Sequence, residues 1–213
     1  MPRNAGRGSA GLARSLATRA VIGERALKNR IRNSLCLLLG LLGFKSLPAY
    51  AALDMFLCAD ELQGEAQDPA YLNCIDVLAW SWGMSNSGTT HIGGVGGEAK
   101  VNVQDISVTK YIDKATPDLM LLTASGKHFP KLELFVSKPC PADCTAYPYF
   151  KLTMTEVLVT SVSTGGSGGE DRLTENVSFN FAKVEWCYTA TLKDGLPDTP
   201  ECGGWDIVTN TQL

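Results

Sequence analysis

Three expected β-strands change, partway along, the face that carries their apolar side chains. The strands and the dipeptides at which they change face are Val101–Tyr111 at Gln104-Asp105, Leu152–Val162 at Thr155-Glu156, and Val177–Tyr188 at Ala182-Lys183. Because successive side chains of a strand point to opposite faces, each change requires a bulge or a passage from one packed sheet to another. Three such changes predict strands that bend around a barrel. We therefore expect a mainly β protein, a compact β-barrel of two sheets closed on each other.

The segments around these strands predict a hairpin, a loop and a tail. The apolar runs Leu53–Leu62 and Ile75–Met84 are separated by turn-forming residues, as in a hairpin with a long loop. The glycine-rich segment Ser87–Glu98 predicts an extended loop. From Lys193 onward the chain is rich in Pro and Gly, which predicts a short C-terminal tail.

One short helix is expected, at Pro117–Ser125. Thr116 can cap its N-terminus, proline suits the first helical position, and Gly126 can end it. Leu119 and Leu122 lie three residues apart on one face. The sequence therefore predicts a helix that packs against the flank of the barrel.

Charge divides the chain into two parts. Residues 1–51 contain nine Lys and Arg and one acid, Glu24, for a net charge of +8. Residues 52–213 contain ten Lys and Arg and 21 acids, for a net charge of −11. A domain this acidic repels phosphate backbones, so we do not expect a nucleic-acid partner.

The N-terminal part has the pattern of an export signal. A basic run at Arg25–Arg32 precedes the apolar stretch Ser34–Phe44, and Ala49 and Ala51 then occupy the −3 and −1 positions of a cleavage site. The apolar stretch is shorter than the roughly 20 residues that a membrane-spanning helix needs. A buried helix is the alternative interpretation. We expect residues 1–51 to be a basic extension with a signal peptide, and residues 52–213 to be one β-barrel domain that is not held in a membrane after cleavage.

The cysteines agree with export. Cys36 would be removed with the signal, and six cysteines remain: Cys58, Cys74, Cys140, Cys144, Cys187 and Cys202. An even number in an exported protein predicts disulfides. The alternative, a metal site, is weak because no C-x-x-C motif occurs and the two histidines, His91 and His128, stand apart.

Patterns for catalysis are weak. The glycine-rich segment Ser163–Asn176 lacks the Lys-Ser/Thr that ends a phosphate-binding loop, and a long turn between strands is the simpler interpretation. No Ser or Cys lies in a nucleophile-elbow context. We expect no catalytic site, no cofactor and no metal.

Trp80 and Trp82 lie on one face of their strand, and Ser81 lies on the other. Two large aromatic side chains can serve as core or as interface anchors, and both interpretations stay open.

Several segments carry a resemblance to a known family. They are DVLAWSWGMSNSG, EAKVNVQDISVTKYIDKATPDLM, ASGKHFP, EVLVTSVSTGGSGGEDRLTENVSFNFAKV and the terminal GWDI. In this order, from Asp54 to Leu213, they resemble the Hcp (haemolysin-coregulated protein) family. The resemblance implies a barrel of two sheets with a flanking helix, assembled as six-fold rings that stack into the tube of type VI secretion systems.

The resemblance also implies roles for particular residues. Ser81 would face the lumen of the ring, where effectors can bind, and Ser167 would lie in a glycine-rich turn. The loop Ser87–Glu98 would contact the next ring, and its glycines are Gly93, Gly94, Gly96 and Gly97. A closed ring of identical subunits requires head-to-tail contacts between different faces. The implied partners are copies of the chain in a homo-hexamer, stacked rings, and the sheath, spike and effector proteins.

Two features depart from the family pattern, the signal peptide and the six cysteines. Both indicate a secreted or periplasmic bacterial protein, and two functions are therefore carried forward. One is a structural subunit of the type VI tube, a secreted hexameric ring that carries effectors. The other is a stand-alone, disulfide-stabilised ring that binds a ligand outside a type VI apparatus.

Strand geometry predicts the disulfide pairing. If Leu57 and Ile75 face the core, Cys58 and Cys74 lie together on the opposite face of the hairpin. Cys140 and Cys144 flank a turn that contains proline, and Cys187 and Cys202 would fasten the tail. The predicted pairs are Cys58–Cys74, Cys140–Cys144 and Cys187–Cys202.

Overall fold

The structure is a computed structural model, and it describes residues 53–86, 100–140, 146–169 and 171–213. Several sequence predictions fall outside these residues. They concern the signal peptide with Ala49 and Ala51, the loop glycines Gly93, Gly94, Gly96 and Gly97, and Cys144. No helix among the described residues is long and apolar enough to cross a membrane.

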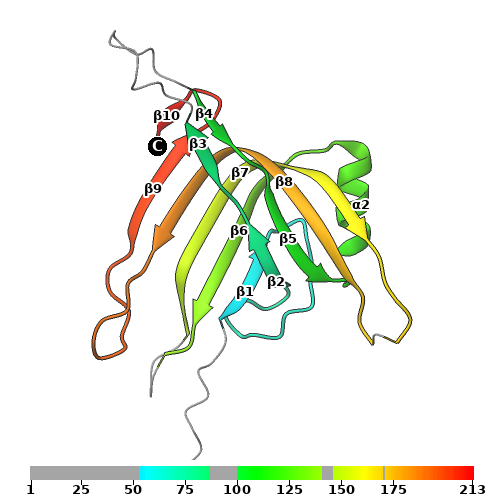
Figure 1. Cartoon of the computed structure of the whole chain (residues 1–213), viewed down its shortest axis with the longest axis horizontal. Helices are drawn as coiled ribbons and strands as arrows, with labels where there is room; N and C mark the ends of the chain where they lie inside the picture. The colour runs from blue at the N-terminus through cyan, green and yellow to red at the C-terminus, as the bar shows by residue number, and fades with distance from the viewer. Residues whose placement is uncertain (1–52, 87–99, 141–145, 170) are drawn as a thin grey trace, which may run out of the picture. The chain divides into compact units, whose positions relative to one another are not determined.

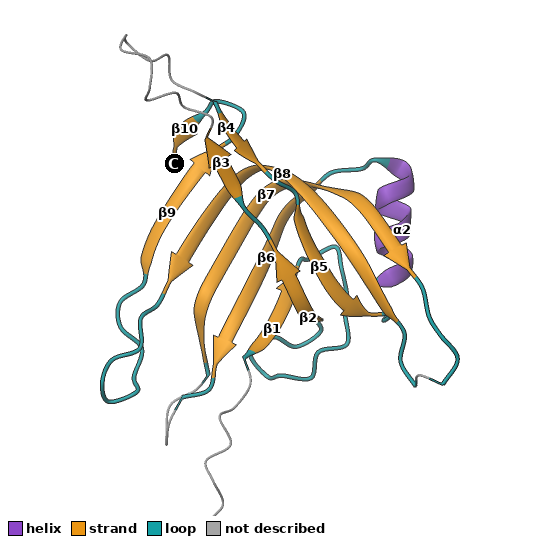
Figure 2. Cartoon of the chain, in the orientation of Figure 1, coloured by secondary structure: helices purple, strands orange, loops and turns teal. Residues whose placement is uncertain are grey.

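Six antiparallel strands form a closed barrel (Figures 1 and 2). In their order around the barrel they are β8 (Thr174–Tyr188), β5 (Ile106–Tyr111), β2 (Ile75–Ser81), β1 (Asp54–Cys58), β6 (Phe129–Lys138) and β7 (Tyr147–Thr164). The barrel closes because β7 also pairs with β8 along most of its length. The predicted mainly β barrel with one short flanking helix is confirmed, and the barrel is a single sheet that closes on itself.

The predicted changes of face in β7 and β8 are confirmed, and β6 changes face at the same level. In β7, Met154 and Val157 are both buried, so Thr155 and Glu156 lie between two inward-facing residues. Glu156 has a φ of 54°, and this left-handed conformation redirects the strand. Opposite it, Phe181 and Val184 of β8 are both buried, and β6 buries Phe129 and Leu132. Three neighbouring strands therefore bend together around one core.

The third change of face has a different cause. At Gln104-Asp105 the expected strand is divided into β4 (Val101–Val103) and β5. β4 pairs with β3 (Met84–Asn86) in a separate two-stranded sheet. The expected strand Ile75–Met84 is likewise interrupted, because β2 ends at Ser81 and the Gly83 carbonyl accepts a hydrogen bond from the Gln104 N–H at 3.0 Å.

The prediction of a C-terminal tail is wrong. Glu201–Asp206 forms β9, which pairs in register with Lys183–Tyr188 of β8, and Thr211–Gln212 forms β10 on its other side. The glycines of β9, Gly203 and Gly204, interrupt the alternation of side chains by which a strand is predicted, but in the structure Gly203 has a packing role. A Cβ on Gly203 would lie 3.0 Å from the Trp186 ring nitrogen, so a larger residue at this position would crowd that ring.

The helix α2 (Thr116–Ser125) packs on the barrel through Leu119, which is fully buried, and Leu122. Gly126 ends it as predicted, with a φ of 64° and an N–H that donates to the Leu122 carbonyl. The predicted cap is wrong. Ala115 holds the N-cap position without a side-chain hydrogen bond, and Thr116 is the first helical residue because its hydroxyl donates to buried Glu175 instead.

Candidate functional sites: the serine row, a buried ion cluster and two disulfides

The two tryptophans of the Trp80-Ser81-Trp82 motif are part of the core. Trp80 stacks on Phe150 with ring centroids 5.6 Å apart and planes inclined by 10°. Trp82 lies against Phe181 and Trp186, at 6.4 Å and 6.3 Å. Both tryptophans are partly buried against the main apolar cluster, which favours a role in the core over a role as interface anchors.

Ser81 faces outward and begins a row of serines across four strands, which we call the serine row. Cross-strand pairing joins Ser81 to Ser107, Ser107 to Ser178, and Ser178 to Ser161. Ser81, Ser107 and Ser178 each lie between two core residues, and Ser161 lies beside exposed Thr160 at a register shift of β7. The four serines therefore share the outer face of β2, β5, β8 and β7.

The rows beside the serine row are also polar. On one side, the Thr109 hydroxyl donates to the Asn176 side chain at 2.7 Å. On the other side, the two carboxylate oxygens of Asp105 accept hydrogen bonds from Thr160 and Asn180, each at 2.7 Å. This face therefore presents small, mostly uncharged polar side chains to solvent.

A cluster of charged residues is buried where β5, β8 and the start of α2 meet. The Lys110 ammonium contacts Glu175 and Asp113, both at 2.7 Å, and Lys110 and Glu175 are fully buried. The Thr116 hydroxyl donates to Glu175 at 2.8 Å and accepts from the Asp113 N–H at 3.1 Å. These contacts join β5, β8 and the start of α2. They anchor the start of the helix on the barrel. Because Lys110 and Glu175 are fully buried, we do not interpret the cluster as a binding site.

Sequence reasoning missed this cluster, although a signal was present. Lys110 follows buried Ile106 and Val108 at alternate positions, so its side chain must point inward. Glu175 precedes buried Val177 in the same way, and Lys110 and Glu175 are cross-strand partners. A lysine and a glutamate at core positions of neighbouring strands indicate a buried ion pair.

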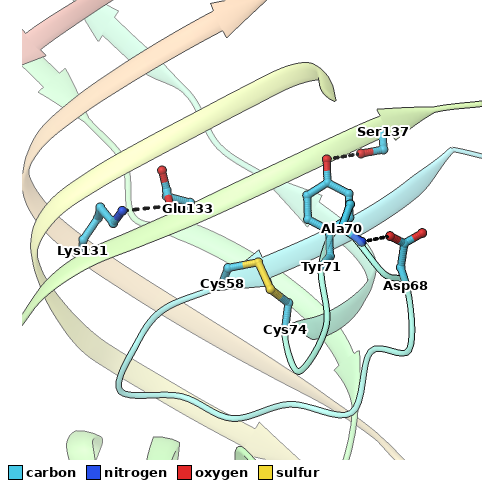
Figure 3. The surroundings of a disulfide bond; sticks show 8 residues. All are labelled: Cys58, Asp68, Ala70, Tyr71, Cys74, Lys131, Glu133 and Ser137. Atoms are coloured by element: carbon cyan, nitrogen blue, oxygen red, sulfur yellow. Dashed lines mark hydrogen bonds and ion pairs between the residues drawn. A yellow bond between two sulfur atoms is a disulfide. The ribbon is translucent and has the colours of Figure 1, made fainter. Parts of the chain in front are cut away.

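The disulfide Cys58–Cys74 is confirmed (Figure 3). Leu57 and Ile75 are fully buried, as predicted, and the cysteines lie on the outer side of the hairpin. Next to them, Tyr71 closes the loop between β1 and β2 over a second, smaller apolar cluster.

This second cluster is well packed. The Tyr71 ring stacks on Phe56 at 4.5 Å and contacts Phe135 at 5.0 Å, and its hydroxyl accepts from Ser137 at 2.8 Å. Gly64 lies so close to the backbone that a Cβ would collide with the Cys74 carbonyl oxygen. The loop therefore requires glycine at this position.

Glu133 of β6 is the cross-strand partner of Cys58 and binds two lysines. Its carboxylate contacts Lys131 at 3.0 Å (Figure 3) and Lys151 at 2.8 Å. Partial burial opposes ionisation of Glu133, but the hydrogen bonds and charges of the two lysines outweigh it and lower the pKa of the carboxyl group. The three side chains form an ion network beside the disulfide.

The disulfide Cys187–Cys202 is also confirmed, and it joins cross-strand partners on β8 and β9. Cys202 is exposed and Cys187 is half-buried. Cys140 is disulfide-bonded as well. Its predicted partner, Cys144, lies outside the described residues, so this pairing stays a prediction.

The other candidate residues are not brought together. Ser167 lies in the exposed loop between β7 and β8. His128 lines a hollow between the end of α2 and β6, together with Leu121, Lys127 and Phe129. Among the described residues no group of three or more His, Cys, Asp or Glu side chains could hold a metal ion.

Comparisons with known proteins identify the family. The model of the family described as "Type VI secretion system effector, Hcp" matches residues 56–188. The chain is 53% identical over 162 residues to protein hcp1 of Pseudomonas aeruginosa, covering 76% of this chain and 99% of that protein.

Solved structures agree with this family. Hcp1 from Salmonella typhimurium is 33% identical with a TM-score of 0.62, over 76% of this chain and all of that chain. A structure described as a type six secretion system protein is 28% identical with a TM-score of 0.70, over the same shares. A type VI secretion system effector from Yersinia pestis is 27% identical with a TM-score of 0.59, over 72% of this chain and 99% of that chain. The chain therefore belongs to the Hcp family of secreted type VI secretion proteins.

Proposed function

We propose that the barrel domain is a structural subunit of a type VI secretion tube, a homo-hexameric ring that stacks with other rings and carries effectors in its lumen. Its partners would be the sheath, spike and effector proteins of the apparatus. Family membership supports this proposal, and the surface of the barrel supports it independently.

The serine row is the observation that carries the proposal. Exposed protein surfaces ordinarily carry many charged side chains of both signs. Here the outer face of four neighbouring strands presents Ser81, Ser107, Ser178 and Ser161, in a domain with a net charge of −11. Small uncharged side chains keep a wall hydrated without projecting into the space beside it. This face suits the lumen wall of a ring through which proteins pass.

Unpaired strand edges offer head-to-tail contacts. Among the described residues, no strand pairs with the outer edge of β9 at Glu201–Gly203 or with the outer edge of β4 at Val101–Val103. Free backbone N–H and C=O groups at such edges are ready to pair with another chain. Two different edges on one subunit permit the heterologous contacts that close a ring.

The loop that leaves β3 and returns at β4 would provide the contacts between rings, through Gly93, Gly94, Gly96 and Gly97. Residues of both strands line a mainly apolar hollow of about 380 Å³, together with Trp186 and Trp205.

Export would begin with the signal peptide and cleavage after Ala51, which leaves the domain secreted or periplasmic. The disulfides support this location because such bonds persist in oxidising compartments. Mass-spectrometric mapping of the N-terminus tests it. A mature protein that begins at Ala52 supports export through cleavage, whereas an exported protein that retains Arg25–Arg32 refutes it.

The disulfides also favour a second candidate function, a stand-alone exported ring that binds a ligand without a type VI apparatus. Deletion of the sheath gene in the source bacterium separates the two functions. Release of the protein should stop if it is a tube subunit and continue if it is a stand-alone ring.

The lumen assignment is tested by electron microscopy of labelled rings. A thiol-reactive gold label on Ser81→Cys should add density to the central hole. The matched control is Lys131→Cys. Lys131 has a side chain that is 52% exposed, and it lies on β6, which is outside the four strands of the serine row. Its label should lie on the rim. Label density on the rim for Ser81→Cys would contradict the assignment.

A further inference from the structure

The two described disulfides close loops of nearly equal length but differ in their surroundings. The sequence separations are 16 residues for Cys58–Cys74 and 15 for Cys187–Cys202. Both cysteines of the first pair are half-buried, and β1 is paired on both sides, with β2 and β6. In the second pair Cys202 is exposed. Loop length therefore does not distinguish the two bonds, but access and local packing do.

We call residues 201–213, which contain β9 and β10, the C-terminal ribbon. It lies at the margin of the sheet and pairs only with the last part of β8 (Figure 1). Its apolar contribution to the core is small, because Trp205 and Ile207 are only partly buried, whereas Val208 is 73% and Leu213 is 51% exposed. The ribbon thus depends on backbone pairing, one ion pair and the disulfide.

The loop closed by Cys58–Cys74 is held in more ways. Ala66 is fully buried and Tyr71 is 8% exposed within the second cluster. Backbone hydrogen bonds join Gly64 to Asn73 at 2.7 Å and Ala66 to Cys74 at 3.0 Å. We expect these contacts to hold the loop in place when the Cys58–Cys74 disulfide is opened.

We infer that Cys202 is a site of thiol–disulfide exchange, and that opening Cys187–Cys202 releases the C-terminal ribbon from β8 while the barrel stays closed. The reactant is a thiolate, supplied by a small thiol or by the dithiol of an oxidoreductase. The inference concerns a subunit outside a ring, because a neighbouring subunit paired with the outer edge of β9 at Glu201–Gly203 would cover Cys202.

The exchange proceeds in two steps. The thiolate attacks the Sγ of Cys202 and forms a new S–S bond with it. The bond to Cys187 breaks with its electron pair on the Cys187 Sγ, which takes a proton from water. A second thiolate then attacks the mixed disulfide and releases the Cys202 thiol. The reductant is oxidised to its own disulfide, and the protein gains two thiols.

Release of the ribbon would expose a strand edge. Residues 183–188 of β8 pair with β9 on one side and with β7 on the other. Without β9 their outer N–H and C=O groups are free to pair with an added strand. The redox state of one surface disulfide would thus determine whether this edge is available.

The rates of reduction test the site. The purified full chain is treated with limiting dithiothreitol, thiols are trapped with N-ethylmaleimide at intervals, and peptides are quantified by mass spectrometry. Cys187 and Cys202 should be alkylated at least about tenfold faster than Cys58 and Cys74, because access governs attack on a disulfide. Equal rates, or faster opening of Cys58–Cys74, overturn the inference.

The attacked sulfur and the source of the thiolate are identified separately. With reduced glutathione, the adduct should be found on Cys202 and the alkylated thiol on Cys187, and the reverse pattern overturns the assignment of Cys202. Thioredoxin, a protein dithiol, is used in parallel. Faster reduction by thioredoxin at equal thiol concentration identifies an oxidoreductase as the source, and faster reduction by glutathione identifies a small thiol.

Hydrogen exchange tests release of the ribbon. In the variant with Cys187→Ser and Cys202→Ser, amide exchange should rise at least about tenfold in residues 183–188 and 201–206. It should stay unchanged in residues 54–58 of β1. The matched control carries Cys58→Ser and Cys74→Ser and should leave exchange in residues 201–206 unchanged. Unchanged exchange in the first variant overturns the release.

Discussion

The closed barrel and the C-terminal ribbon are both antiparallel β-structure, yet they are held together differently. Each barrel strand pairs with neighbours on both sides and buries apolar side chains, and a buried ion cluster joins β5, β8 and α2. The ribbon pairs mainly with one strand, and its ion pair, Lys183–Asp206 at 3.2 Å, is near the surface. Strand pairing alone therefore does not indicate local stability. We expect the barrel to be more stable than the ribbon because it buries more apolar side chains and its ion cluster is shielded from solvent.

The largest expected effect comes from breaking the buried ion cluster. Lys110→Met leaves the Glu175 and Asp113 carboxylates buried without their cation and should lower the free energy of unfolding by about 3–5 kcal/mol. Denaturant titration measures the loss. The double variant with Glu175→Leu should recover part of it, because one of the two uncompensated charges is then removed. A loss below about 1 kcal/mol for Lys110→Met would contradict the assigned role of the cluster.

A smaller loss is expected in the hairpin loop. Gly64→Ala forces a methyl group against the Cys74 carbonyl oxygen and should cost about 1–3 kcal/mol. The matched control is Gly165→Ala, because a Cβ at Gly165 meets no atom within 4 Å and should change stability by less than about 0.5 kcal/mol. Equal thermal unfolding of the two variants would show that the loop adapts to the added methyl group.

A pH effect distinguishes two surface carboxyl groups. The folded pKa of Glu133 is lowered, so its stabilising contribution is present above the pKa of the unfolded chain and is lost as pH falls through the folded value. Burial raises the pKa of Asp76 in β2. Ionised Asp76 therefore lowers the stability of the fold at neutral pH, and this cost is lost as pH falls through the folded pKa.

Glu133→Gln should therefore reduce the loss of stability on acidification, by roughly 0.2–1 kcal/mol. Asp76→Asn should increase stability at neutral pH. Thermal unfolding between neutral pH and pH 3 measures both changes, and a steeper acid dependence in Glu133→Gln would contradict the assigned ion network.

The smallest effect is expected for the ion pair of the ribbon. Lys183→Gln removes an ammonium whose side chain is 44% exposed and should change global stability by about 0.5 kcal/mol or less. Denaturant titration beside Lys110→Met sharpens the comparison, because both variants remove a lysine from an ion pair on the barrel. Equal losses in the two variants would show that burial does not separate the two regions.

Strand alternation allowed much of the barrel to be predicted. The changes of face at Thr155-Glu156 and Ala182-Lys183 indicated bent strands because alternation depends only on local geometry. The same rule placed Leu57 and Ile75 in the core and so paired Cys58 with Cys74. Local geometry does not determine which strand closes on which, and the pairing of β7 with both β6 and β8 had to be observed.

The failures have physical causes. The strand β9 lacked a pattern because Gly203 and Gly204 stand where alternating side chains would indicate a strand. Threonine is a common N-cap residue, but the Thr116 hydroxyl donates a hydrogen bond to Glu175, a carboxylate far away in the sequence. The serine row could not be assembled from the sequence, because it depends on the register of four strands that are far apart in the chain.

Measurement of the mass of the assembled protein tests whether this barrel is a ring subunit. The mature, oxidised protein is examined by light scattering over a hundredfold range of concentration, and native mass spectrometry counts the subunits. We expect a species of six subunits that persists on dilution. A protein that stays monomeric at every concentration would contradict it.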